Sequence, residues 1–201
     1  MIPNPEAYFR KLVPTRDTLL VALEEEARKE GIPIVGPVVG ELLFILARAT
    51  TAKHILELGT ATGYSAIYLA QACDAFEGRV VTLEIDGGMA RRAQANLEKA
   101  GLEHRVEILV GDAFEEMTKM QGPFDFAFLD IDKESYAGAL SHCERLLKPG
   151  GFLVADNVAF QGADEFNRAV SAHSHWRAVH LLSLLPQHSP EKDGLCLAVR
   201  V

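Results

Sequence analysis

Cysteine, positive charge and long uninterrupted apolar runs are all scarce in this chain of 201 residues. Its three cysteines lie far apart and lack the spacing of metal ligands: Cys73, Cys143 and Cys196. This pattern excludes a disulfide framework and predicts reduced thiols in the core. The apolar residues 32–47 are interrupted by glycine, proline and Glu41, so they do not predict a membrane span.

Basic residues are outnumbered, with 20 lysines and arginines against 28 acids and a formal net charge of −8. No basic tract marks a phosphate-binding surface, so a nucleic-acid partner is not expected. The N-terminus, residues 1–6, does not have the pattern of a signal peptide. We therefore expect a cytoplasmic protein that does not associate with membranes.

The hydrophobic content, 48%, is enough for one sizeable core, and no linker or repeat divides the chain. We predict one domain over residues 1–201, with 1–50 as a helical extension and 51–201 as the core. Residues 15–30 predict a helix capped by Gly31, and Pro37 opens a second one. The second helix is expected to bury a stripe of four residues: Val38, Leu42, Ile45 and Ala49. Helices that are apolar on one face and have only one domain to cover predict a homodimer.

From His54 onward, short apolar runs alternate with helical patterns. The runs cover residues 54–58, 79–85, 106–110, 124–129 and 151–155, and the helical patterns cover 63–73, 87–100, 113–120 and 134–147. This alternation is typical of a parallel sheet with helices on both faces. Two further strands, Trp176–Leu182 and Leu195–Val201, predict an antiparallel end to the sheet. The expected fold is α/β, with a doubly wound, mainly parallel seven-stranded Rossmann-like sheet and extra N-terminal helices.

Two of the buried strands end in side chains that can bind a hard cation. Asp130-Ile131-Asp132-Lys133 follows one strand, and Asp156-Asn157 follows the other. Oxygen ligands at one edge of a parallel sheet suit Mg²⁺ or a similar ion and leave positions open for substrate. Asp132 is equally compatible with an N-cap of the next helix.

The first three strands end in features of a nucleoside site. Gly59 and Gly63 permit a tight turn, Glu84 follows 21 residues after Gly63, and Asp112 ends the third strand. The turn is G-x-x-x-G instead of G-x-G-x-x-G, and Glu57 precedes it. Acids favour a ligand with a sulfonium and an amino group over a pyrophosphate. The pattern therefore favours S-adenosylmethionine over a dinucleotide.

Four segments together resemble signatures of the cation-dependent O-methyltransferases, the catechol and caffeoyl-coenzyme A O-methyltransferase group. They are residues 57–65 (ELGTATGYS), 128–133 (FLDIDK), 156–158 (DNV) and 193–195 (DGL). The resemblance covers residues 30–201 and implies a class I S-adenosylmethionine-dependent enzyme. It implies divalent-metal-dependent methyl transfer to a hydroxyl of a catechol-like small molecule.

The resemblance also implies residue roles. Asp130, Asp156 and Asn157 would bind the metal, with Mg²⁺ expected and Mn²⁺ or Ca²⁺ as alternatives. Lys133 would be the catalytic base beside Asp130. The implied cofactor-binding residues are Glu57, Gly59, Thr60, Gly63, Tyr64, Ser65, Glu84, Asp112, Ala113 and Asp130.

Two segments depart from the family pattern. Phe160 stands near a position where many relatives have tryptophan, and we expect it to form a wall of the acceptor pocket. Residues 185–192 match no pattern of the family, so the acceptor is open. A hydroxylated tRNA base is the alternative acceptor, although the acidic composition disfavours it. A non-enzymatic nucleoside-binding module is a third reading, which the intact metal residues and Lys133 oppose.

The pair His173-x-His175 resembles a metal chelate. On a helix the two rings would point away from each other, and no carboxylate is adjacent in sequence. We therefore expect both side chains at the surface and no chelate.

Overall fold

Seven strands form one sheet in the order β3-β2-β1-β4-β5-β7-β6 in the computed structural model, which describes residues 1–201. The strands are β1 His54–Leu58, β2 Arg79–Glu84, β3 Val106–Val110, β4 Phe124–Leu129, β5 Leu147–Ala155, β6 Trp176–Leu184 and β7 Lys192–Arg200. Strands β1 to β5 are parallel, and β7 pairs antiparallel with both β5 and β6. The predicted architecture, including the antiparallel end, is confirmed.

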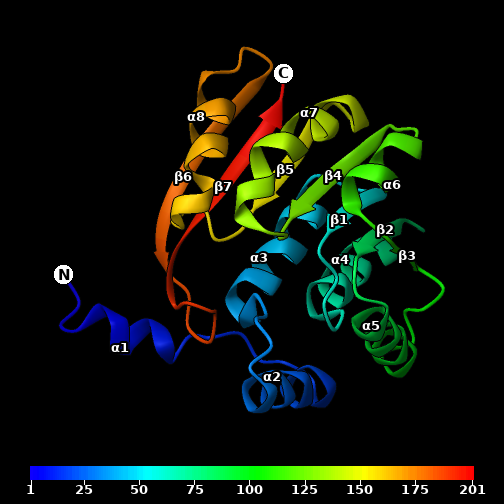
Figure 1. The fold of residues 1–201 in the computed structure, drawn as a ribbon. Coiled ribbons are helices and arrows are strands. Elements are labelled where there is room, and N and C mark those ends of the chain that lie inside the picture. The colour runs from blue at the N-terminus through cyan, green and yellow to red at the C-terminus, as the bar shows by residue number, and fades with distance from the viewer.

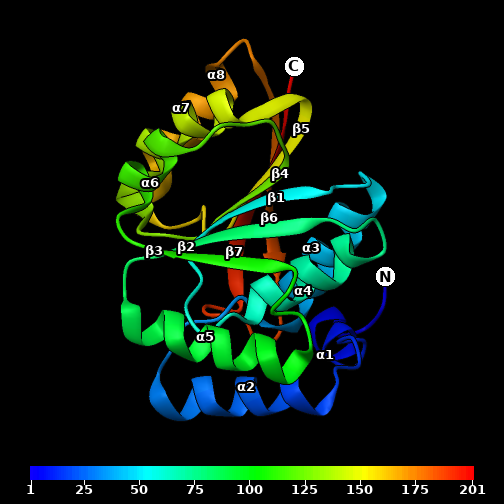
Figure 2. The same ribbon diagram turned by 90° about the vertical axis from the view of Figure 1, so that its right-hand side faces the viewer.

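Helices cover both faces of this sheet (Figure 1, Figure 2). One side carries α2 Thr18–Glu30, α3 Gly36–Ala49, α4 Tyr64–Asp74 and α5 Gly87–Ala100, and the other carries α6 Ala113–Lys119, α7 Tyr136–Leu146 and α8 Asp164–Ala172. Two short 3₁₀ segments, η1 Lys133–Ser135 and η2 Gln161–Ala163, precede α7 and α8. None of the helices combines the length and the apolar composition needed to cross a membrane.

Alternating residues of each central strand supply two separate cores. In β1, Ile55 packs with the helices α2 to α4, whereas Leu56 and Leu58 pack with α7 and α8. Since both faces are buried, the strands consist of continuous apolar runs. The strand order reverses between β1 and β4, which opens a crevice at the carboxyl ends of these strands.

The predicted buried face of α3 was only partly right, because Val38 and Leu42 pack against the core but are only partly buried. Val39, Leu43 and Ala47 are fully buried, whereas Ile45 is 52% exposed. Gly40 explains the rotation, because a Cβ there would lie 2.5 Å from the Tyr68 ring of α4. The helix thus packs through its small residues, which an apolar stripe does not reveal.

The prediction also missed one helix and misplaced the start of a strand. Helix α8, a short amphipathic segment, was not predicted. Strand β5 begins at Leu147, four residues before the predicted start. Its pairing with β4 is irregular between Phe124 and Phe126, and this irregularity accommodates Pro149 and Gly150.

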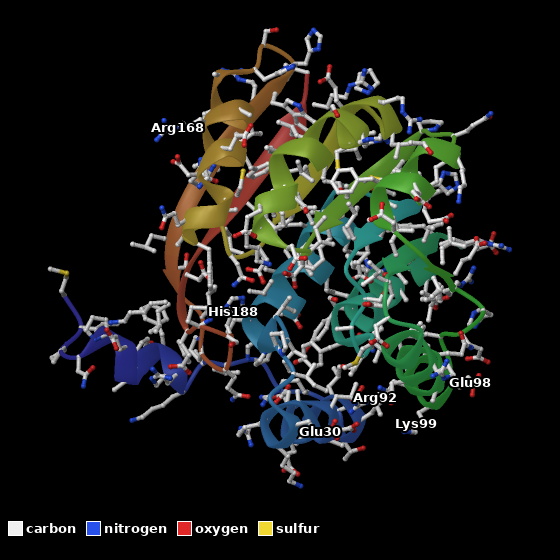
Figure 3. The ribbon with its side chains drawn as sticks, in the orientation of Figure 1. Glu30, Arg92, Glu98, Lys99, Arg168 and His188 are labelled. Carbon is white, nitrogen blue, oxygen red and sulfur yellow. The ribbon has the colours of Figure 1, made fainter.

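Helix α2 buries Leu20, Leu23 and Ala27 against the core and is also joined to α5 by ion pairs. Arg92 of α5 pairs with Glu30 of α2, both of which Figure 3 labels, and also with Glu26. Helix α1, Pro5–Arg10, has no buried residue and stands away from the sheet. It reaches the loop between β6 and β7 through Arg10, which forms a bidentate pair with Glu191.

Candidate active site

A cavity of about 840 Å³ lies at the carboxyl ends of β1, β2, β4 and β5. It brings together most of the residues selected from the sequence: Gly59, Thr60, Tyr64, Ser65, Glu84, Asp112, Ala113, Asp130, Lys133, Asp156 and Asn157. Glu57 and Gly63 do not line it and lie behind its wall. Phe160 does line it.

The turn that follows β1, residues 59–63, is called the first turn here and lies directly against the end of β4. Gly59 has a φ of 96°, and a Cβ on this residue would lie 2.0 Å from the Asp130 carbonyl oxygen. Only glycine fits this conformation and this approach. The first turn and the acidic side chain that follows β4 are therefore adjacent.

Glu84 connects the ends of β1 and β2. Its carboxylate accepts hydrogen bonds from the backbone N–H of Ala61 at 2.7 Å and of Asp86 at 2.9 Å. Asp112 caps α6, because its Oδ1 accepts from the N–H groups of Phe114 and Glu115. Both side chains keep free oxygen lone pairs at the cavity wall.

Glu57 is fully buried beneath the first turn. One carboxylate oxygen accepts from the Thr82 hydroxyl at 2.6 Å, and the other, Oε1, has no hydrogen-bond partner. Burial raises the pKa of Glu57 to about 7, against the opposing effect of the Thr82 and Ser65 hydroxyls. An orphaned buried carboxylate oxygen suits a cationic ligand in the neighbouring cavity, such as the methionine end of S-adenosylmethionine.

Helix α2 supports the cavity wall by contacting Tyr64, the first residue of α4. The Tyr64 hydroxyl donates to Glu24 Oε1 at 2.7 Å, and Glu24 forms a bidentate pair with Arg16. Glu24 is 5% exposed, so this network is largely shielded from solvent. It fixes the ring of Tyr64 at the cavity.

Asp130, Asp156 and Asn157 converge at the other end of the cavity. Asp156 is 1% exposed, and its Oδ1 accepts the Asn157 N–H at 2.9 Å. The Asn157 side-chain nitrogen donates to Asp193 Oδ2 at 2.5 Å and to the Ser189 carbonyl at 3.3 Å. With its nitrogen occupied in this way, the amide presents its oxygen as the free ligand atom.

The charges in this cluster fit a divalent cation. Burial and the neighbouring charge of Asp156 raise the pKa of Asp130, while Lys133 opposes the shift. Two close carboxylates and one amide oxygen are ligands that Mg²⁺ and similar ions accept. A bound cation would relieve the repulsion between the carboxylates.

Lys133 is held beside this cluster at a fixed position. Its Nζ donates to Asp130 Oδ1 at 2.7 Å, to the Ile131 carbonyl at 3.0 Å and to the Tyr136 hydroxyl at 3.0 Å. The Tyr136 hydroxyl lies 3.0 Å from the Asp156 carbonyl oxygen, so one buried phenol links the two strand ends. Asp132 makes no capping hydrogen bond, and α7 begins only at Tyr136 after a 3₁₀ turn, so the N-cap interpretation was wrong.

Three residues at this end were given no role by the sequence. Tyr136 lies within a predicted helix, and Asp193 belongs to a family signature that assigns it no contact. His188 lies in the loop after β6 (Figure 3), 32 positions after Asp156, and its Nε2 is 2.8 Å from Asp156 Oδ2. Such a long-range contact leaves no local sequence signal. Burial lowers the pKa of His188, but the hydrogen bond and charge of Asp156 outweigh it and raise the pKa overall.

The two histidines at 173 and 175 are not on a helix, because α8 ends at Ala172. Both face Glu144 of α7, with His175 Nδ1 at 2.6 Å and His173 Nε2 at 3.5 Å from its carboxylate oxygens. The expectation that the two rings point away from each other on a helix was therefore wrong. Their exposure on the surface agrees with the prediction.

Comparison with known proteins identifies the family. A protein-family model described as O-methyltransferase matches residues 15–182 of the chain. The chain therefore belongs to the O-methyltransferase family. A catechol O-methyltransferase of Niastella koreensis is 36% identical over 96% of this chain and 94% of its own length. A catechol O-methyltransferase of Mycobacterium tuberculosis is 37% identical over 78% of this chain and 73% of its own length.

Solved structures agree with this assignment. The O-methyltransferase TomG of Streptomyces achromogenes, involved in tomaymycin synthesis and solved with SAM, has a TM-score of 0.88 at 30% identity, covering 98% of this chain and 96% of its own. An O-methyltransferase of Bacillus cereus, solved with SAH, has a TM-score of 0.88 at 29% identity, covering 98% and 97%. The resemblance to the cation-dependent family is confirmed, and the chain is an S-adenosylmethionine-dependent O-methyltransferase of class I.

Proposed function

We propose that this O-methyltransferase methylates one hydroxyl of a catechol-like small molecule with the aid of a divalent cation. The observation that carries the proposal is the convergence of Asp130, Asp156 and Asn157 beside Lys133 at one end of the cavity. Two relatives that cover most of this chain are named catechol O-methyltransferases, which supports the acceptor class. The net charge of −8 favours a small molecule over a nucleic acid.

S-adenosylmethionine would supply the methyl group, and a divalent cation would lower the pKa of a chelated hydroxyl and fix its direction. Asp130, Asp156 and Asn157 would hold that cation. Lys133 Nζ, which the Tyr136 hydroxyl orients, would accept the hydroxyl proton in its neutral form, after it has released one of its own protons. Tyr64 and the first turn would orient the methionine end toward Asp130. Orientation of two bound reactants contributes at most on the order of 7–11 kcal/mol to lowering the barrier.

The remaining walls of the cavity suit a flat ring. Val35, Phe160 and Pro190 line it together with the acidic cluster. Apolar walls with a few convergent polar groups are typical of small-molecule sites. A catechol would place its ring among these side chains and its two oxygens at the cation.

Transfer from labelled S-adenosylmethionine should be measured with catechol and with phenol, before and after treatment with EDTA. We expect methylation of catechol only, loss of activity in EDTA and recovery when a divalent cation is added back. Asp156→Ala and Asn157→Ala should abolish transfer and retain cofactor binding, whereas Asp130→Ala should affect both. Full activity with all metal removed would contradict the proposal.

We also propose a cytoplasmic homodimer that folds as one domain. All three cysteines are buried and free, which suits a reducing compartment.

The dimer is suggested by helix α1, which has only six residues, none of them buried. It exposes two aromatic side chains, Tyr8 at 43% and Phe9 at 54%. So short a helix needs tertiary contacts, and a second copy would supply them. Light scattering at micromolar concentration should give a dimer, and chemical unfolding should give one transition.

A further inference from the structure

His188 is the one imidazole at the acidic end of the cavity. Its side chain is 1% exposed, although it belongs to the loop between β6 and β7. Histidine is seldom so buried unless both ring nitrogens have partners. The contacts of the ring therefore indicate its role.

The two ring nitrogens of His188 have different partners, a backbone carbonyl and a carboxylate. Nδ1 lies 2.7 Å from the Pro190 carbonyl oxygen, which can only accept, so Nδ1 carries a proton. Nε2 points at Asp156 Oδ2, 2.8 Å away. Histidines that bind metals almost always donate their other N–H to a carbonyl or carboxylate in this manner. A cation bound beside Asp156 would displace the proton that Nε2 shares with this carboxylate, and Nε2 would then face the cation with its lone pair.

The separation of the two donor atoms also fits a shared ion. Neighbouring ligands of an octahedral ion with bonds of about 2.1 Å lie about 3.0 Å apart. The separation between Nε2 and Asp156 Oδ2 is close to this value. At this separation both atoms can contact one ion.

The loop that carries His188 is held from both sides. Glu191 accepts from the Gln187 N–H at 2.9 Å and pairs with Arg10 of α1. On the other side, Gln187 lies so close to Gly36 that a Cβ there would be 2.7 Å from the Gln187 carbonyl oxygen. A ligand supported in this way needs little ordering when it binds.

We propose that His188 Nε2 is a fourth protein ligand of the cation site, beside Asp130, Asp156 and Asn157. This inference rests on the proposed function and deepens it. Imidazole suits first-row transition metals, whereas Mg²⁺ is bound mainly by oxygen. A site with three oxygens and one nitrogen prefers Mn²⁺, Fe²⁺ or Co²⁺ to the Mg²⁺ expected from the sequence.

Pulsed electron paramagnetic resonance of the Mn²⁺-loaded protein tests this assignment, because a directly bound imidazole gives a ¹⁴N coupling. The measurement should use a His173→Ala/His175→Ala background, which removes the surface histidines facing Glu144. We expect the coupling before substitution of His188 and its loss in His188→Gln. His142→Gln, a change on the outer helix α7, is the matched control and should retain it.

Titration calorimetry provides a second measurement. We expect His188→Gln to weaken Mn²⁺ binding by roughly 10–100-fold and Mg²⁺ binding by much less. Bound Mn²⁺ without a ¹⁴N coupling, or a coupling that persists in His188→Gln, would overturn the ligand assignment and leave the proposed function intact. No binding of any divalent cation would overturn both.

Discussion

The side-chain amide of Asn157 donates a 2.5 Å hydrogen bond to the fully buried carboxylate of Asp193. Asp193 also accepts from the backbone N–H of Gly194 at 2.6 Å, so its own position is fixed by β7. The start of β7 thereby sets the direction of a proposed metal ligand at the end of β5. Partners of this kind commonly affect metal affinity nearly as strongly as the ligands themselves.

Asp193→Ala should weaken binding of the divalent cation by roughly 10–100-fold, because the Asn157 amide loses the partner that orients it. Affinity for S-adenosylmethionine should change little. Titration calorimetry with each ligand checks both points. Asp164→Ala, at an exposed position of α8, is the control. An unchanged cation affinity in Asp193→Ala would mean that the Asn157 oxygen is not a ligand.

The sheet and one half of the cavity could be predicted because their signals are local. Each central strand is a continuous apolar run, and Asp130 and Asp156 directly follow such runs. Parallel strands then bring these ends to one edge of the sheet without further information. The roles of the residues in the cavity remain proposals, but their placement together follows from this rule.

The other contacts could not be predicted because they depend on packing between distant segments. His188 meets Asp156 only because the loop of residues 185–191 folds back over β5. Helix α3 turns a different face to the core because Gly40 admits the Tyr68 ring. His173 and His175 meet Glu144 because α8 ends before them. None of these approaches has a periodic signal in the sequence.

Lys133→Ala should lower the rate of methyl transfer by roughly 10²–10⁴, the usual contribution of a positioned base. Binding of cation and cofactor should persist. The defect should shrink at high pH, where hydroxide can remove the acceptor proton. Steady-state rates across about pH 6–9 test this prediction. Lys148→Ala is the control, because Lys148 pairs with Asp125 away from the cavity. A wild-type rate in Lys133→Ala at every pH would exclude Lys133 as the base.

Glu84→Ala should weaken binding of S-adenosylmethionine by roughly 1.5–3 kcal/mol, the range for hydrogen bonds to a charged group. Glu84 also accepts the Ala61 N–H, so part of the loss would come from the first turn. Titration calorimetry measures the effect. Asp86→Ala, at the N-cap of α5, serves as the control for a nearby lost carboxylate. Equal affinities of Glu84→Ala and the wild type would show that Glu84 does not contact the cofactor.

Glu57→Gln should stabilise the ligand-free protein, and the gain should grow with pH. The pKa of Glu57 is raised from 4.5 to about 7 in the folded state, chiefly by burial. Below pH 4.5 the Glu57 carboxyl group is protonated in the folded and in the unfolded protein, so its burial costs no ionisation free energy. Between the two values the unfolded chain loses its proton first, so stability falls as pH rises. Above about pH 7 the full cost is present, about 3 kcal/mol.

Urea unfolding of both proteins without ligand, at about pH 5 and about pH 8, measures this difference. The advantage of Glu57→Gln should be small at the lower pH and close to the full value at the higher one. A cationic cofactor favours the ionised carboxylate, so wild-type affinity for S-adenosylmethionine should rise through pH 7 and that of Glu57→Gln should not. Unfolding free energies that differ equally at both pH values would show that Glu57 ionises normally. In that case the unpaired Oε1 of Glu57 would not be a protonated group that ionises when the cationic cofactor binds.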